Sequence, residues 1–255
     1  MSDTRIETQG SAFGKILLNE SRLAWRIPIG IGIGLGLPLI LLIVFGSIPA
    51  MRQASSDLDG FSYFALSFPT LIVMTVMTLS IMALPRNLIK YRETGILRRL
   101  SVTPVPPSWL LAAQIVINLA IVVVGFVLLT AAGVAAFGLE LPKNFPAFLL
   151  SVILTVTALF AVGLFMAAVI RNDAVAQGIG GLLFFALMFF GGIWLPRPMM
   201  PVVLLNISNW TPLGASVVAI QTAMQGTFPS LQSILVLIAY TLVFGYLTVR
   251  YFKWE

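Results

Sequence analysis

Residues 108–137 read SWLLAAQIVINLAIVVVGFVLLTAAGVAAF, an apolar stretch without a single Asp, Glu, Lys or Arg. A helix that crosses the apolar core of a membrane needs about 20 consecutive apolar residues, and this stretch is long enough. Five further stretches of this kind lie near 27–48, 61–84, 146–170, 174–195 and 231–251, and none has a charge near its centre. The sequence therefore predicts an all-α membrane protein with six transmembrane helices in one domain, 1–255.

The composition agrees with a chain that is dissolved in lipid. Of its 255 residues, 59% are apolar and 9% are charged, whereas soluble domains carry about a quarter charged residues. The net charge of +6 comes from basic residues that flank the apolar stretches. Such residues set the orientation of membrane helices, so we do not expect nucleic acid as a partner.

The distribution of Lys and Arg predicts which ends of the helices face the cytoplasm. Twelve of these residues fall in the N-terminal tail, in 85–107, at Arg171 and at the C-terminus, and only Arg52, Lys143 and Arg197 fall on the other side. Loops rich in Lys and Arg stay in the cytoplasm. We therefore expect a multi-pass protein of the cytoplasmic (inner) membrane with both termini inside.

Several reaction classes are excluded by residues that the chain lacks. Without His or Cys, it has neither the usual proton shuttle and metal ligand nor a Cys–His or Ser–His pair. The only Gly-Lys pair, at 14–15, has no glycine-rich loop before it, so no ATP-binding loop is present. No acidic residue lies within an apolar stretch, which argues against proton-coupled transport. We expect no catalytic site, metal site or cofactor here, and a partner must supply the energy.

The loop at 85–107 contains KYRETGILRRLSVTPVPPSW at 90–109, the most basic segment of the chain. Pro85 suits a first helical turn, apolar residues recur through 87–100, and Thr103-Pro104 ends the pattern. The loop therefore predicts a short amphipathic helix for docking of a partner, with Glu93 as its only acid. Ordinary positive-inside anchoring is the alternative. Residues 13–25 predict a helix in the cytoplasmic interface, or else a frayed leader.

The segment between the last two stretches begins near Trp194 and is apolar, but it is broken by prolines that include Pro196, Pro201 and Pro212. A straight crossing there would lose backbone hydrogen bonds that lipid cannot replace. Thr211-Pro212 is a favourable helix start, and 225–226 is a plausible helix end. The sequence predicts one or two half-buried, re-entrant helices on the external side before the last span.

Two of the spans carry side chains that could contact an apolar cargo. They are Met74, Met77 and Thr78 in the second span, and Phe184, Phe185 and Met188 in the fifth. Met and Phe adapt to irregular apolar ligands, so as a group they favour a hydrophobic or amphipathic cargo. Helix packing and lipid contact are the alternative for each residue.

These segments resemble the ABC-2 type permeases, the membrane subunits of exporters related to daunorubicin-resistance transporters. The resemblance rests on the segment 93–100 followed by Thr103-Pro104, and on 192–196, 200–201, 207–208 and 211–212, in the same order. It implies two permeases, identical or paralogous, surrounded by membrane lipid and bound to two cytoplasmic ATPase subunits that hold ATP and Mg²⁺. A polysaccharide- or teichoic-acid-exporting permease remains an alternative, as does a non-transporting scaffold or channel.

The resemblance also implies roles for individual residues. A coupling helix at 86–100 would insert into the ATPase, and the second and fifth spans would line the permease interface and the cargo path. The implied coupling residues are Arg92, Glu93, Gly95, Leu97, Arg98, Arg99 and Leu100.

Overall fold

The structure is a computed structural model that describes residues 13–23, 28–58, 60–96, 106 and 108–252. The described part is helical, and its only β-type pairing is an isolated bridge between Ala54 and Ser62. After a helix over 13–23, the elements are α2 (Pro28–Ser47), α3 (Pro49–Arg52), η1 (Ser56–Leu58), α4 (Tyr63–Met77), η2 (Thr78–Ala83), α5 (Leu84–Glu93), α7 (Ser108–Phe137), α8 (Phe145–Val169), α9 (Asp173–Gly191), η3 (Arg197–Met199), α10 (Val202–Trp210), α11 (Pro212–Met224) and α12 (Leu231–Tyr251).

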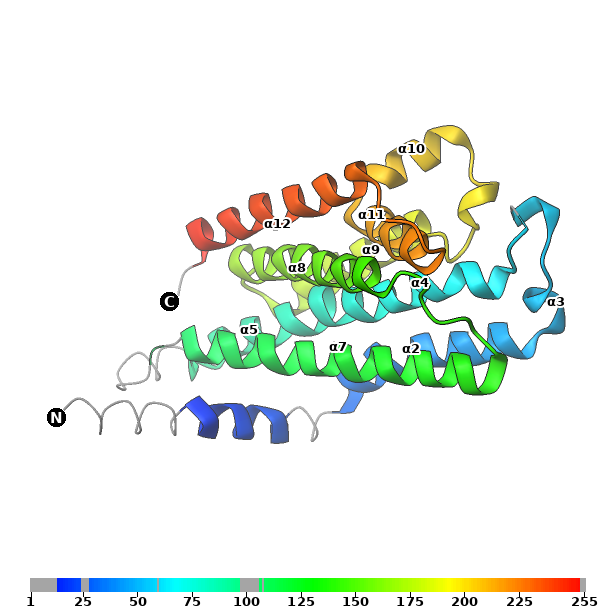
Figure 1. Ribbon diagram of the computed structural model, residues 1–255. Helices are drawn as coiled ribbons and strands as arrows, with labels where there is room; N and C mark the ends of the chain where they lie inside the picture. Colours follow the sequence, from blue (N-terminus) through cyan, green and yellow to red (C-terminus); the bar gives the residue numbers. More distant parts are fainter. Residues whose placement is uncertain (1–12, 24–27, 59, 97–105, 107, 253–255) are drawn as a thin grey trace.

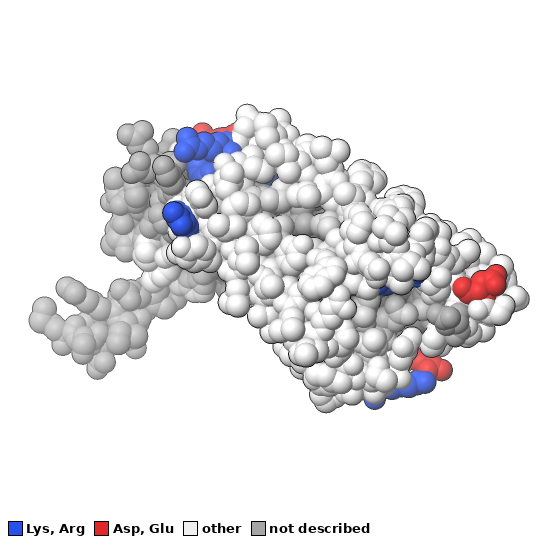
Figure 2. All heavy atoms as spheres, turned by 90° about the horizontal axis from the view of Figure 1, so that it is seen from above, with Lys and Arg blue, Asp and Glu red and all other residues white. Residues whose placement is uncertain are grey.

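The predicted class, an all-α membrane protein, is confirmed. Within the described residues, five helices are long and apolar enough to cross a membrane: Tyr63–Glu93, α7, α8, α9 and α12. The remaining expected stretch, 27–48, contains α2, and the part of α2 over Gly34–Ser47 is also apolar. The long helices share one general direction (Figure 1). In Figure 2 the charged side chains gather toward the two ends of the molecule, and the broad surface between them is uncharged.

The two ends of the bundle carry different elements. α5, the start of α7 and the end of α12 lie at one end, which we call the α5 end (Figure 1). The short helix α3 and the segment between α9 and α10 lie at the opposite end, which we call the α3 end. The distribution of Lys and Arg predicts that the α5 end faces the cytoplasm and the α3 end faces outward.

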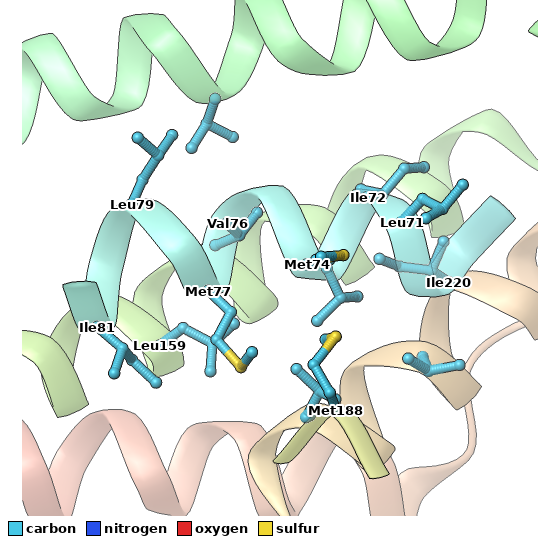
Figure 3. Packing of buried hydrophobic residues seen from close by; sticks show 14 of the residues in the cluster. Leu71, Ile72, Met74, Val76, Met77, Leu79, Ile81, Leu159, Met188 and Ile220 are labelled. Atoms are coloured by element: carbon cyan, nitrogen blue, oxygen red, sulfur yellow. The ribbon is translucent and has the colours of Figure 1, made fainter. Parts of the chain in front are cut away.

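The helix of the second apolar stretch is central in the molecule. Its most apolar part is 89% buried, compared with 28% in α7 and 17% in α12. It packs against α2, α7, α8, α9 and α11, and in Figure 3 its side chains point both toward α7 and toward the opposite group of helices. Most of the hydrophobic core is therefore built around α4, η2 and α5.

This central helix continues past the boundary that we expected at residue 84. α4 passes through the π-helical turn η2 into α5, so the expectation that Pro85 begins a separate helix is wrong. Proline normally ends a helix because its ring collides with the carbonyl group four residues earlier. In η2, the Leu84 N–H bonds to the Leu79 carbonyl five residues back. This wider turn lets the helix pass Pro85 and continue to Glu93.

Candidate functional site

α5 ends inside the predicted coupling segment. The Gly95 N–H bonds to the Arg92 carbonyl at 3.1 Å, and Gly95 has φ +71°, a left-handed conformation that favours glycine. The chain therefore turns at Thr94–Gly95, and the single amphipathic helix expected over 87–100 is wrong. Of the implied coupling residues, Leu97, Arg98, Arg99 and Leu100 lie outside the described residues.

Arg92 fastens the end of α5 to the end of α8. Its guanidinium donates to the carbonyl oxygens of Ala167 at 3.3 Å and Ile170 at 3.4 Å. It also lies 5.5 Å from the ring centroid of Phe252, just beyond α12. The last carbonyl groups of a helix lack backbone partners and attract cations, so an arginine suits this position. Arg92 thereby joins α5 to both α8 and the C-terminal end of α12.

Glu93 fastens the same end of α5 to the start of α9. Its carboxylate accepts a hydrogen bond from the backbone N–H of Asp173, the first residue of α9, at 3.0 Å. Carboxylates stabilise helix N-termini because the exposed N–H groups there carry partial positive charge. In addition, the Arg86 guanidinium lies 3.8 Å from the Asp173 carboxylate. We expected Glu93 to face arginines or a partner, and its contact is with the protein's own backbone.

A polar cluster joins α5 to α7 and to the N-terminal helix. The Tyr91 hydroxyl and the Gln114 amide both donate to the carboxylate of Glu20. The Asn87 amide donates to the Gln114 side-chain oxygen at 3.1 Å. The helix over 13–23 thus bonds to α5 and α7 at the α5 end. The sequence did not reveal this cluster, because its members are separated by up to 94 positions along the chain.

At the α3 end, side chains from other elements donate to the last carbonyl groups of α9 and to a carbonyl group in the turn that follows it. The Thr70 hydroxyl donates to the Gly191 carbonyl at 3.0 Å, and the Tyr63 hydroxyl donates to the Ile193 carbonyl at 2.9 Å. The buried Ser208 hydroxyl donates to the Phe190 carbonyl at 2.7 Å. α4 and α10 are therefore both bonded to the end of α9.

Arg197 also bonds to this end of α9, although its position in the sequence suggested only a role in orientation. Its guanidinium donates to the Phe190 carbonyl at 3.5 Å, to the Ser208 hydroxyl and to the side-chain oxygen of Asn209. Burial lowers the pKa of Arg197 to about 10, so the guanidinium remains charged at neutral pH. The one feature of the sequence that could have drawn attention to Arg197 is that it is a single cation within an apolar, proline-rich segment.

The proline-rich segment between α9 and α12 forms two short helices rather than a straight span. α10 and α11 meet at an angle of 94°, as in a broken span or a re-entrant loop. α11 begins as expected, because the Thr211 hydroxyl accepts the Gly214 N–H at 3.0 Å and Pro212 is in the first turn. Pro196 and Pro201 directly precede η3 and α10, and the Trp194 side chain is exposed.

The proposed path residues do not lie together on one open surface. Met74, Met77, Thr78, Phe184 and Met188 are buried inside the chain's own core, and Phe185 is 63% exposed. In Figure 3, Met74 and Met77 lie on the side of the central helix that faces Met188 and Leu159. The Thr78 hydroxyl bonds within its own helix, to the Met74 carbonyl at 2.8 Å. In this conformation, only Phe185 of the set is available to a cargo or a second chain.

Comparison with known proteins identifies the family. The family model described as ABC-2 type transporter matches residues 12–225, which is most of the chain. The chain belongs to the ABC-2 type transporter family. It is also 27% identical, over 176 residues, to a Bacillus subtilis (strain 168) protein named "Putative transport permease YvfS", and this alignment covers 69% of the chain and 71% of that protein.

Membership of the ABC-2 family gives the ends of the bundle a functional context. The chain is the membrane subunit of an ABC transporter, a class in which ATPase partners act with the membrane subunits. The matched range includes α5, the start of α7 and the bent pair α10–α11. Arg92 and Glu93 therefore lie within the range that the family model matches, and they connect α5 to α8 and α9.

Proposed function

We propose that this chain is the permease subunit of an ATP-driven exporter for a hydrophobic or amphipathic compound, such as a drug, an antibiotic or a lipid. Two permeases, identical or paralogous, would bind two cytoplasmic ATPase subunits that hydrolyse ATP with Mg²⁺. The family match carries this proposal. The missing ATP-binding loop supports a separate ATPase.

We place ATPase coupling at the α5 end, in the segment around Arg92, Glu93 and Gly95. A displacement of this segment would act on α8 through Arg92 and on α9 through Glu93 and Arg86. α9 ends at the opposite side of the molecule, where Thr70 and Ser208 bond to its last carbonyl groups. A rigid α9 would thus transmit motion from the ATPase side to the external helices.

We place the permease–permease interface and the cargo path along the exposed stripe of α9. Large apolar side chains recur there every three or four residues, which puts them on one helix face. This α9 stripe consists of Val175, Ile179, Leu182, Phe185 and Phe189. An apolar stripe suits a hydrophobic or amphipathic cargo, and the buried Phe184 and Met188 support it from behind.

The interface can be tested by cross-linking, since the chain contains no cysteine. Leu182 is 75% exposed on the α9 stripe, and Val243 is 53% exposed on α12. In membranes containing permease and ATPase, Leu182→Cys should form a cross-linked permease dimer and Val243→Cys should not. Equal cross-linking at both positions would contradict the assignment of α9 to the interface.

The function itself is tested with reconstituted permease and the ATPase that binds it. In proteoliposomes, ATP should drive accumulation of a hydrophobic fluorescent drug on the side opposite the ATPase, and vesicles without permease should show none. If the permease binds no ABC ATPase, or if ATP hydrolysis moves none of a panel of hydrophobic, amphipathic and polar compounds, the exporter proposal fails.

A further inference from the structure

Arg197 is a partly buried cation whose hydrogen-bond partners are all neutral. They are the Phe190 carbonyl, the Ser208 hydroxyl and the Asn209 side-chain oxygen. Among the described residues, ion pairs join only Arg86 to Asp173 and Lys143 to Glu140. No described carboxylate therefore neutralises Arg197.

A role in setting membrane orientation does not by itself explain why the Arg197 side chain turns inward. A residue that only sets the topology can extend its charge into water, as long basic side chains near membranes do. The Lys143 side chain at the same end is 62% exposed. Arg197 instead turns toward the fully buried Ser208 and the end of α9. Charges withdrawn from water near a membrane are costly and commonly mark functional sites.

A small pocket beside Arg197 contains a further hydrogen-bond donor. Arg197 and Gln221 both line this pocket, together with Tyr63 and Thr70. The hydroxyl groups of Tyr63 and Thr70 already donate to carbonyls at the end of α9. The carboxamide of Gln221, which lines the pocket, has no hydrogen-bond partner among the described residues. The guanidinium and this amide can therefore both donate to oxygen atoms of a ligand.

The surface of the surrounding segment is strongly apolar. Trp194 precedes η3, and Val202, Val203 and Trp210 belong to α10; all four side chains are at least 65% exposed. Tryptophan is enriched where a membrane meets water, which suits the end of the bundle that is predicted to face outward. A molecule with its head at Arg197 could lay a hydrophobic tail along this surface.

We propose that Arg197 and Gln221 form a binding site for the acidic headgroup, phosphate or carboxylate, of an anionic amphiphile at the α3 end. Guanidinium groups bind such oxygens through paired, charge-assisted hydrogen bonds. The inference rests on the proposed export function and narrows its cargo class. The headgroup belongs either to exported cargo near its release or to a phospholipid of the outer leaflet.

The test uses the purified permease–ATPase complex in phosphatidylcholine nanodiscs. Dodecyl phosphate is the probe, and dodecanol and dodecyltrimethylammonium are the neutral and cationic comparisons. Binding of dodecyl phosphate should be tighter than that of either comparison, and Arg197→Gln should weaken it on the order of tenfold to a hundredfold. Gln keeps a polar amide donor at this position and removes the charge. Gln221→Leu should also weaken binding, and it provides a second variant if Arg197→Gln misfolds.

Two matched controls remove other charges at the α3 end. Lys143→Gln removes an exposed cation, and Asp57→Asn removes an exposed carboxylate from η1, which contacts η3. Neither should change binding of dodecyl phosphate. If Lys143→Gln weakened binding of dodecyl phosphate as much as Arg197→Gln does, the effect would be one of general surface charge. If dodecanol bound as tightly as dodecyl phosphate, the acidic headgroup would have no role. Either result, or unchanged binding in both Arg197→Gln and Gln221→Leu, would overturn the proposal.

Two further measurements distinguish the source of the headgroup. If phosphatidylglycerol in the nanodisc displaces dodecyl phosphate and remains bound through purification, the site holds a lipid. If dodecyl phosphate instead stimulates ATP hydrolysis and is exported, the site serves cargo. ATPase binding and export of a neutral hydrophobic drug are measured in parallel. If the complex still binds the ATPase and exports the neutral drug but does not prefer dodecyl phosphate to dodecanol, this site is refuted and the exporter function stands.

Discussion

At the scale of single residues, close packing around the central helix depends on Gly163 in α8. A Cβ atom added to Gly163 would overlap the backbone carbonyl oxygen of Ser80 in η2. Backbone atoms in a buried turn cannot move aside as a flexible side chain can. The absence of a side chain at Gly163 therefore allows α8 to pack directly on the π-helical turn.

Gly163→Ala should lower the free energy of unfolding by about 1–3 kcal/mol because it overpacks this contact. Gly245→Ala is the matched control, since no atom lies within 4 Å of the added Cβ on α12. It should be neutral or stabilise by up to about 1 kcal/mol, because alanine favours helix more than glycine does. Thermal unfolding of the detergent-purified proteins measures both changes, and equal melting temperatures would contradict the packing argument.

A second prediction tests whether Met77 belongs to the packed core or lines the cargo path. Met77 is fully buried, so Met77→Ala should destabilise the fold by about 2–5 kcal/mol through loss of packing. Phe185→Ala removes an exposed ring and should change stability little while altering the relative export of different cargoes. Thermal unfolding and export of a cargo panel are compared for the two variants. A stable Met77→Ala protein with altered cargo preference would show that Met77 lines the path.

At the scale of elements, the end of α5 is hydrogen-bonded to four other helices. Arg92 bonds to the end of α8, Glu93 to the start of α9, and Asn87 and Tyr91 to the cluster that includes α7 and the helix over 13–23. These bonds are local to the α5 end, so a partner that moves the following segment would act on several helices together.

Replacement of Glu93 tests this junction. Glu93→Lys removes the carboxylate that accepts the Asp173 N–H and places a cation at the positive end of α9. We expect weaker coupling of ATP hydrolysis to export, with normal membrane insertion. Glu93→Gln keeps an acceptor oxygen and should retain most of the coupling. ATPase activity and export are measured on the same proteoliposomes, and normal coupling in Glu93→Lys would exclude a role for this contact.

At the scale of the whole molecule, the described helices form a bundle, and the face in Figure 2 has charged groups toward its ends and an uncharged surface between them (Figures 1 and 2). Turns at the α5 end and turns at the α3 end must then lie on opposite sides of the membrane. The excess of Lys and Arg around the α5 end predicts that this end is cytoplasmic.

Reporter fusions test the orientation. An enzyme active only outside the cytoplasm should be active when fused after Pro142, between α7 and α8, and inactive when fused after Gly95. A reporter that requires the cytoplasm should give the reverse pattern. The comparison needs both reporters at both sites to control for expression. External activity at Gly95 would invert the topology and remove the proposed ATPase contact.

The positions of the apolar helices could be predicted from the sequence because apolar length is a local property. The stretch at 108–137 coincides with α7, and Thr211-Pro212 begins α11 as its capping chemistry indicates. The all-α membrane class follows from such stretches alone. The basic segment after the second span, which we propose as the candidate site, is likewise a local feature of the sequence. The boundaries expected for its helix were wrong, because the helix passes through Pro85 and the chain turns at Gly95.

Contacts between distant segments were decided by the tertiary structure. Glu93 meets Asp173 across 80 positions, and Thr70 meets Gly191 across 121. The sequence could not distinguish a buried Met77 from an exposed Phe185, because every face of a membrane helix is apolar and no periodicity marks the core. Likewise, Arg197 resembled an ordinary loop cation until Phe190, Ser208 and Asn209 were seen around it. Helix packing depends on side-chain shape rather than on hydropathy, and it determines which of these residues are buried and which contact one another.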